Sequence, residues 1–70
     1  LVVDDEALFA KAVARHLERA GFRCTQVGTL AAARAALAER TPDLLLLDVR
    51  MPDGSGLDFL KQLRQTSAVP

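Results

Sequence analysis

The sequence has little that would suit a secreted, membrane-bound or nucleic-acid-binding protein. Its single cysteine, Cys24, excludes an internal disulfide and fits a reducing compartment. Nine basic residues balance nine acidic ones, so no excess of positive charge favours nucleic acid. The apolar runs are far shorter than the roughly 18 residues of a membrane helix, and we expect no signal peptide. We therefore expect a cytoplasmic location, without direct contact between this segment and a membrane or nucleic acid.

The length of the chain allows one domain at most. Seventy residues bury a smaller share of their surface than a typical domain does. A hydrophobic content of 50% nevertheless excludes a disordered tail. The chain starts at Leu1 inside an apolar run and stops at Val69-Pro70, so we expect both ends to be cut. Residues 1–70 are accordingly expected to form part of a single domain.

Hydrophobic periodicity predicts an alternation of strands and helices. Strands are expected at 1–3, 22–27 and 44–47, and helices at 7–20, 30–40 and from a Ser55–Asp58 capping box to about Gln65. Gly21 is expected to end the first helix and Thr29 to cap the second. The four leucines 44–47 indicate a strand buried on both faces, and 49–54 a loop. The positions expected to face inward are Phe9, Ala12, Val13, Leu17 and Ala20, then Leu30, Ala33 and Leu37, then Leu57, Leu60 and Leu63.

Such an alternation is typical of an α/β fold with a doubly wound parallel sheet. Ligands of these folds bind beyond the carboxyl ends of the strands. The first strand is followed by Asp4 and Asp5, and the third by Asp48. If the strand order is 2-1-3, these three carboxylates converge at one edge of the sheet.

A cluster of three carboxylates is unfavourable unless a cation lies among them. Two unit charges about 5 Å apart repel by roughly 3 kcal/mol at an effective dielectric near 20. Three such pairs approach roughly 10 kcal/mol, comparable to a whole domain's stability of about 5–15 kcal/mol. An all-oxygen site suits magnesium, which favours a phosphate as a further ligand. A carboxylate beside such an ion can attack a phosphoryl group and form an acyl phosphate.

Two stretches of the chain together resemble the receiver domains of bacterial two-component response regulators. They are residues 1–6, LVVDDE, and residues 42–57, PDLLLLDVRMPDGSGL. The resemblance implies a flavodoxin-like fold, here only its first three βα units, and a signalling switch in phosphorelay signal transduction rather than an enzyme. It makes Asp48 the phosphoacceptor, which becomes an aspartyl phosphate. It makes Asp5 a direct magnesium ligand, Asp4 a ligand through water, and the backbone carbonyl of Arg50 a further ligand.

The same resemblance implies partners. A sensor histidine kinase would donate the phosphoryl group. The stretch 48–57 is similar to that of regulators of transcription, which points to a DNA-binding output domain outside this chain. Family members also use a Ser or Thr after a fourth strand and a Lys after a fifth, both expected beyond residue 70.

Two other functions stay open at this point. The first is a magnesium-dependent phosphohydrolase with Asp48 as nucleophile; such phosphatases usually carry a second Asp two positions later, where this chain has Arg50. The second is a receiver-like binding module that is never phosphorylated. Taken alone, Asp4 and Asp5 are more simply explained as helix caps, and Asp48 as a polar strand end.

The remaining reactive or special residues have simpler explanations. Cys24 is expected to be an inert core thiol and His16 a surface residue, because no metal-binding partner lies at helical spacing from it. Gly54 and Gly56 are expected to serve backbone turns. The outer edge of the 44–47 strand would lack a neighbour, so we expect the isolated 70 residues to self-associate or remain partly unfolded.

Overall fold

The apolar start of the chain forms the central strand of a parallel sheet. In the computed structural model, which describes residues 1–66, β1 (Val2–Val3) pairs with β2 (Gln26–Val27) on one side and β3 (Leu46–Leu47) on the other. The resulting order, β2-β1-β3, confirms the predicted 2-1-3 arrangement. The second and third strands are shorter than predicted, and most of 22–26 is exposed.

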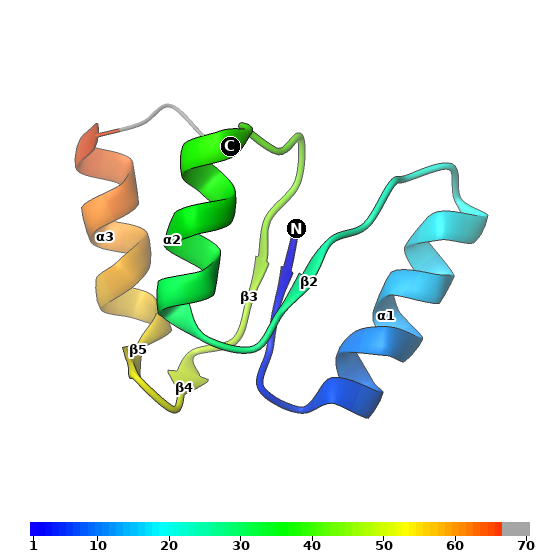
Figure 1. Ribbon diagram of the computed structural model, residues 1–70, viewed down its shortest axis with the longest axis horizontal. Helices are drawn as coiled ribbons and strands as arrows, with labels where there is room; N and C mark the ends of the chain where they lie inside the picture. Colours follow the sequence, from blue (N-terminus) through cyan, green and yellow to red (C-terminus); the bar gives the residue numbers. More distant parts are fainter. Residues whose placement is uncertain (67–70) are drawn as a thin grey trace.

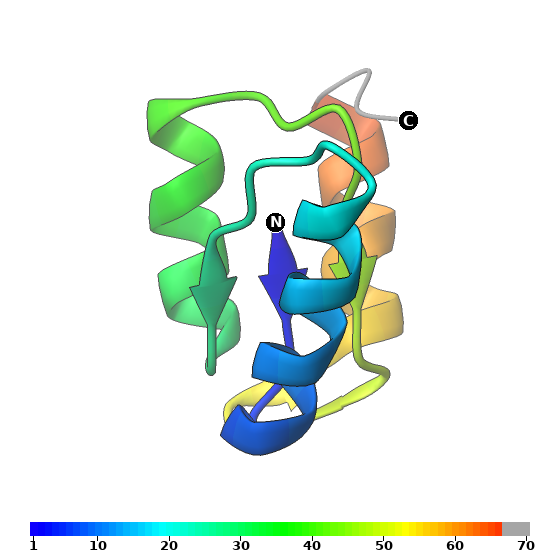
Figure 2. The same ribbon diagram turned by 90° about the vertical axis from the view of Figure 1, so that its right-hand side faces the viewer.

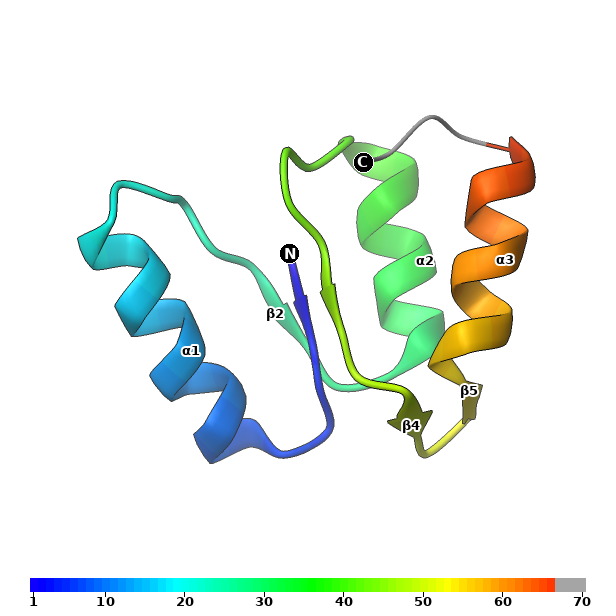
Figure 3. The same cartoon turned by 180° about the vertical axis from the view of Figure 1, so that it is seen from behind.

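Helices cover both faces of this sheet, as expected for a doubly wound fold. Helix α1 (Ala7–Arg19) lies on one face, whereas α2 (Leu30–Glu39) and α3 (Gly56–Thr66) lie side by side on the other (Figures 1 and 3). With the sheet seen face-on, α1 lies in front of it and the other two helices lie behind it (Figure 2). Within the described residues, no helix has both the length and the apolar character needed to cross a membrane.

The main core lies between the sheet and the α2–α3 layer. Its buried members come from four different elements: Val3, Leu30, Ala33, Met51 and Phe59. Leu45 and Leu47 pack against this cluster from β3 and the residue before it. Burying a Val, Leu, Met or Phe side chain stabilises the fold by about 1.5–3 kcal/mol relative to leaving it exposed.

The buried face of helix α1 is rotated from the predicted one and shares only Val13 and Leu17 with it. Phe9 is 58% exposed, while Ala10 and Ala14 are buried and Val13 and Leu17 are half-buried. The most deeply buried residues of α1 are therefore the small residues Ala10 and Ala14, on a helix that packs against β1 and β2. The prediction favoured the large Phe9, and it also placed Ala12 and Ala20 inward although both are exposed.

Two further predictions about burial are wrong. Leu57 is 54% exposed, and α3 instead turns Phe59 into the core. The third strand is not buried on both faces, because Leu44 and Leu46 are 38% and 37% exposed. Their side of β3 faces away from the α2–α3 core, and α1 lies over β1 and β2 rather than over β3.

The segment after β3, predicted as a loop, contains a small antiparallel hairpin. Strand β4 (Arg50–Met51) pairs with β5 (Gly54–Ser55), and Met51 enters the core. Gly54 has φ +150°, a conformation that residues with a Cβ rarely adopt. The predicted cap of α2 is present, since Thr29 Oγ1 accepts from the Ala32 amide at 3.0 Å. Of the predicted Ser55–Asp58 capping box, the bond to Ser55 is present: Ser55 Oγ accepts from the Asp58 amide at 3.3 Å.

Candidate functional site

Parallel pairing of β1 with β3 brings the acidic residues together. Val3 is opposite Leu47, so the next residue of each strand, Asp4 and Asp48, emerges at the same edge of the sheet. The backbone continues the pairing there, since the Asp48 amide donates to the Val3 carbonyl at 2.9 Å. Carboxylate oxygens of Asp4, Asp5 and Asp48 all lie within 4.8 Å of one another. Within residues 1–66, this trio is the group of His, Cys, Asp or Glu that could hold a metal ion.

Local hydrogen bonds orient two of the three carboxylates. Asp4 Oδ1 accepts from the Glu6 amide at 2.9 Å, and Asp48 Oδ1 accepts from the Arg50 amide at 3.3 Å. Asp4 and Asp48 are half-buried, whereas Asp5 is exposed. Helix α1 has Glu6 as its N-cap, without a side-chain capping bond. The simple explanation of Asp4 as the cap of α1 is therefore not what the structure shows, since its bond goes to the N-cap residue.

The cluster has the charge and donor chemistry of a site for a hard divalent cation. At 4.8 Å two carboxylates repel by about 1 kcal/mol in bulk water and by about 3 kcal/mol at an effective dielectric near 20. Oxygens on opposite sides of a magnesium ion lie about 4 Å apart, and the ion usually retains several waters. The span of the three carboxylates fits such an ion if one of them binds through water. All the donors are oxygens, which suits magnesium or calcium better than zinc.

The backbone around Asp48 is closely packed by the start of α3. The Gly56 amide donates to the Val49 carbonyl at 2.8 Å. A Cβ on Gly56 would overlap the backbone carbonyl of Asp48 and lie 3.0 Å from the Val49 Cα. Glycine at position 56 thus permits the close approach that holds the strand end bearing Asp48, which goes beyond the general turn role predicted for it.

Asp53 is a residue that the sequence analysis did not single out. Its Oδ1 accepts from the Leu30 amide at 2.8 Å and its Oδ2 from the Ala31 amide at 3.0 Å. The bond from Leu30, followed by the bond from Ala31, lowers the pKa of Asp53 from its usual value of 3.8. The Pro-Asp-Gly run around it signals a turn, but not a contact with a helix 23 positions earlier.

Two reactive residues lie outside the acidic cluster. His16 is exposed on α1, as predicted. Cys24 is half-buried, and its Sγ donates to the Ala14 carbonyl at 3.5 Å. Neither belongs to the group that could hold a metal.

The chain matches known proteins over nearly all or all of its length. Residues 1–70 match the family model described as the response regulator receiver domain. The chain is 41% identical to the KDP operon transcriptional regulatory protein KdpE of Escherichia coli over 70 residues, which are 100% of this chain and 31% of that protein. It is 45% identical to the DNA-binding transcriptional regulator NtrC of Escherichia coli over 64 residues, which are 91% of this chain and 14% of that protein.

A solved structure has the same fold. A mutant of the response regulator MaeR bound to sulfate superposes with a TM-score of 0.86 at 36% identity, covering 97% of this chain and 57% of that one. The chain thus spans less than two thirds of each of these relatives. The family model, the flavodoxin-like topology and the sequence similarity all agree. The chain therefore belongs to the response regulator receiver domain family, the phosphoryl-accepting modules of two-component signalling.

Proposed function

We propose that Asp48 accepts a phosphoryl group from a sensor histidine kinase, and that the chain acts as a switch rather than as a turnover enzyme. The proposal assigns magnesium to Asp4, Asp5, Asp48 and the backbone carbonyl of Arg50, with Asp4 binding through water. It treats residues 1–70 as the first three βα units of a receiver domain.

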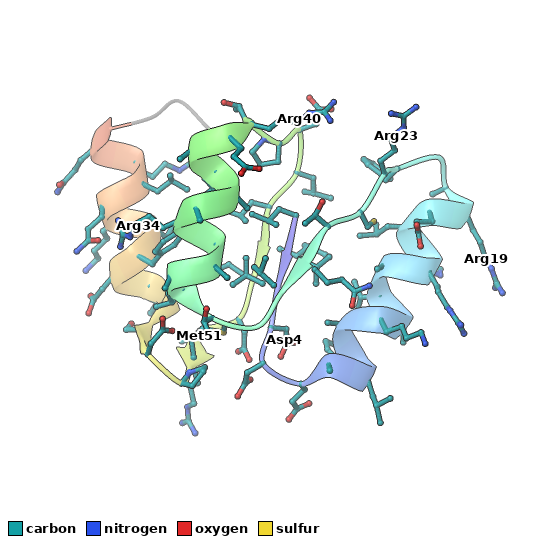
Figure 4. All side chains as sticks on the ribbon, in the orientation of Figure 1. Asp4, Arg19, Arg23, Arg34, Arg40 and Met51 are labelled. Atoms are coloured by element: carbon teal, nitrogen blue, oxygen red, sulfur yellow. The ribbon has the colours of Figure 1, made fainter. Side chains whose placement is uncertain are left out.

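One observation carries the proposal: three carboxylates from the ends of two adjacent strands lie within 4.8 Å of one another. Figure 4 shows Asp4 at the end of the molecule where Met51 and the β4–β5 hairpin also lie. Asp48 follows β3 directly, and its carboxylate is held by the Arg50 amide. A nucleophile in this position is fixed by the strand, which favours attack in one direction.

The chemistry of the step follows from these groups. A carboxylate oxygen of Asp48 attacks the phosphorus of a phosphohistidine, the P–N bond breaks, and the imidazole leaves with the electron pair and takes up a proton. Magnesium, when bound, neutralises charge on the phosphoryl oxygens. Asp4 and Asp5 supply the negative charge that holds the ion next to Asp48. The product is an aspartyl phosphate on Asp48.

The output of the switch is proposed from the relatives. KdpE and NtrC are named as regulators of transcription, and NtrC as DNA-binding. We propose that phosphorylation of Asp48 controls a DNA-binding output domain outside this chain, in the cytoplasm. The sensor kinase contacts the edge of the sheet that carries the three carboxylates, because the phosphoryl group must reach Asp48 there.

The proposal is tested with beryllofluoride, which mimics a phosphoryl group. The full-length protein is titrated with it in the presence and absence of magnesium, together with the variant Asp48→Asn. The control is Asp43→Asn, an exposed carboxylate at the opposite end of β3. We expect magnesium-dependent binding by the wild type and by the control, and none by Asp48→Asn.

Three results would contradict the proposal. Equal binding by Asp48→Asn would remove Asp48 as the acceptor. Steady release of phosphate from small phosphate esters, far above one equivalent, would instead support the phosphohydrolase. In the third result, the wild type fails to bind beryllofluoride while Asp48→Asn binds a protein partner as tightly as the wild type does. That result would support a binding module that is never phosphorylated.

A further inference from the structure

The turn of the β4–β5 hairpin is tied to the first turn of α2 by Asp53. Each of its carboxylate oxygens accepts one amide of that turn, from Leu30 at 2.8 Å and from Ala31 at 3.0 Å. Thr29 accepts the next amide, from Ala32 at 3.0 Å. The amides at a helix start lack partners within the helix and carry partial positive charge. At α2, two of these three amides donate to the carboxylate of Asp53, which lies more than 20 positions further along the chain.

Apolar packing holds the hairpin at the same place. Met51 of β4 and Leu30 of α2 are buried in one core cluster. A Cβ on Gly54 would lie 3.2 Å from the Leu30 Cδ1, so the hairpin backbone and this leucine are already in close contact. The position of the hairpin relative to α2 is therefore determined by polar and apolar contacts together.

The other end of the hairpin segment carries the acidic site. The Arg50 amide donates to Asp48 Oδ1 at 3.3 Å, and the Gly56 amide closes the segment on the Val49 carbonyl at 2.8 Å. Residues 48–56 thus form one closed unit with Asp48 at its start and Asp53 at its turn. A displacement of the turn would move the Arg50 backbone relative to Asp48.

We propose that Asp53 is a positioning residue for the acidic site: by binding the start of α2, it holds the hairpin so that the Arg50 backbone stays against Asp48. The inference rests on the proposed function, in which the Arg50 carbonyl is a magnesium ligand. A ligand held in place before the ion arrives loses less conformational entropy on binding. Because coupling between two events is reciprocal, occupancy of the site strengthens the bonds from Asp53 to α2 by the same factor.

The first experiment compares two variants that remove caps from the same helix. Asp53→Ala removes both hydrogen bonds between the hairpin and α2. Thr29→Ala removes a hydrogen bond between two residues at the start of α2. Magnesium and beryllofluoride affinities are measured for both in the full-length protein. We expect Asp53→Ala to weaken magnesium binding by about tenfold and Thr29→Ala to leave it within about twofold of the wild type.

The second experiment needs no variant. Amide hydrogen exchange at Leu30, Ala31 and Ala32 is measured by NMR in the full-length protein, with and without magnesium and beryllofluoride. We expect the ligands to slow amide exchange at Leu30 and Ala31. The factor should be about the same as the one by which Asp53→Ala weakens magnesium binding, and exchange at Ala32 should change less. A residue that only stabilises α2 would show no such dependence on the ligands.

The outcomes separate this inference from the proposed function. If the wild type does not bind beryllofluoride with magnesium, the proposed function fails and this inference fails with it. If the wild type binds and the two variants behave alike, Asp53 is a structural cap and only this inference is overturned. If Asp53→Ala does not fold, Asp53→Asn retains one acceptor oxygen and should give an intermediate loss of affinity. Unchanged affinity in Asp53→Asn, together with ligand-independent exchange, would also overturn it.

Discussion

The Cα of Gly56 lies against the backbone carbonyl of Asp48, with no room between them for a Cβ. The start of α3 and the end of β3 are in contact there, and the Gly56 amide bonds the Val49 carbonyl at 2.8 Å. The backbone of Asp48, the residue proposed to carry the phosphoryl group, is thus packed against the backbone at the start of α3. A change at Gly56 should therefore affect both stability and the acidic site.

We expect Gly56→Ala to lower the free energy of unfolding by about 1–3 kcal/mol, because the added methyl forces the backbone of Asp48 and Val49 to shift. The matched control is Gly28→Ala, whose Cβ would meet only the Asp4 carbonyl at an ordinary 3.9 Å. Urea unfolding of both variants checks this. Equal effects of the two substitutions would contradict the close approach at Gly56.

The acidic cluster predicts that one substitution has opposite effects with and without magnesium. Without the ion, Asp5→Asn removes repulsion and should raise the free energy of unfolding by about 1 kcal/mol or less. With magnesium at 100 times its Kd, the wild type should gain about 2.7 kcal/mol, and Asp5→Asn clearly less. Thermal unfolding with and without magnesium measures both effects.

The control for this experiment is Asp43→Asn, which removes an exposed carboxylate at the amino end of β3. It should gain as much stability from magnesium as the wild type does. An equal gain in Asp5→Asn would mean that Asp5 does not bind the ion.

The lowered pKa of Asp53 predicts a pH dependence of stability. Because the folded-state pKa lies below the usual value of 3.8, the ionised carboxylate stabilises the folded chain above about pH 4, and this contribution is lost as the pH falls through the folded-state pKa. The difference in free energy of unfolding between the wild type and Asp53→Ala should therefore shrink between pH 6 and pH 3.

Thr29→Ala serves as the control, because a hydroxyl does not titrate in this range. Its difference from the wild type should stay constant while that of Asp53→Ala shrinks. A constant difference for both variants would mean that the charge of Asp53 contributes nothing to the cap.

Arg34 joins the two helices on one face of the sheet. Its guanidinium lies 5.1 Å from the ring centroid of Phe59, and its Nη2 donates to Gln62 Oε1 at 3.1 Å. We expect Arg34→Ala to lower the free energy of unfolding by about 0.5–1 kcal/mol, as for an exposed cation–π pair. Arg15→Ala, at an exposed position in α1, should have a smaller effect in the same denaturation experiment.

The edge of β3 predicts self-association of the 70-residue chain. Within residues 1–66, β3 pairs only with β1, and Leu44 and Leu46 are more than a third exposed beside the open edge. Such an edge favours pairing with another chain. Sedimentation velocity should detect oligomers that Leu46→Lys reduces, whereas Leu8→Lys, at an exposed position on α1, should not. A monodisperse wild-type monomer would contradict this.

The sequence by itself determined the alternation of three strands with three helices and the acidic residues that follow the first and third strands. Strand–helix alternation limits the fold to parallel strands, and the carboxyl ends of neighbouring parallel strands must meet. Asp4, Asp5 and Asp48 could therefore be grouped once the strand order 2-1-3 was assumed, and the structure has that order. The cap at Thr29 was also predictable, because it involves an amide only three positions away.

Only the tertiary structure decided which faces are covered and which distant groups meet. The rotation of α1, with Phe9 outward and Ala10 inward, depends on how closely the helix approaches β1, which its own periodicity does not report. The exposure of Leu46 depends on what packs over β3. The bond from Asp53 to Leu30 joins residues 23 positions apart. Such contacts depend on the packing of the whole chain, whereas a sequence pattern reports only on neighbours within a few residues.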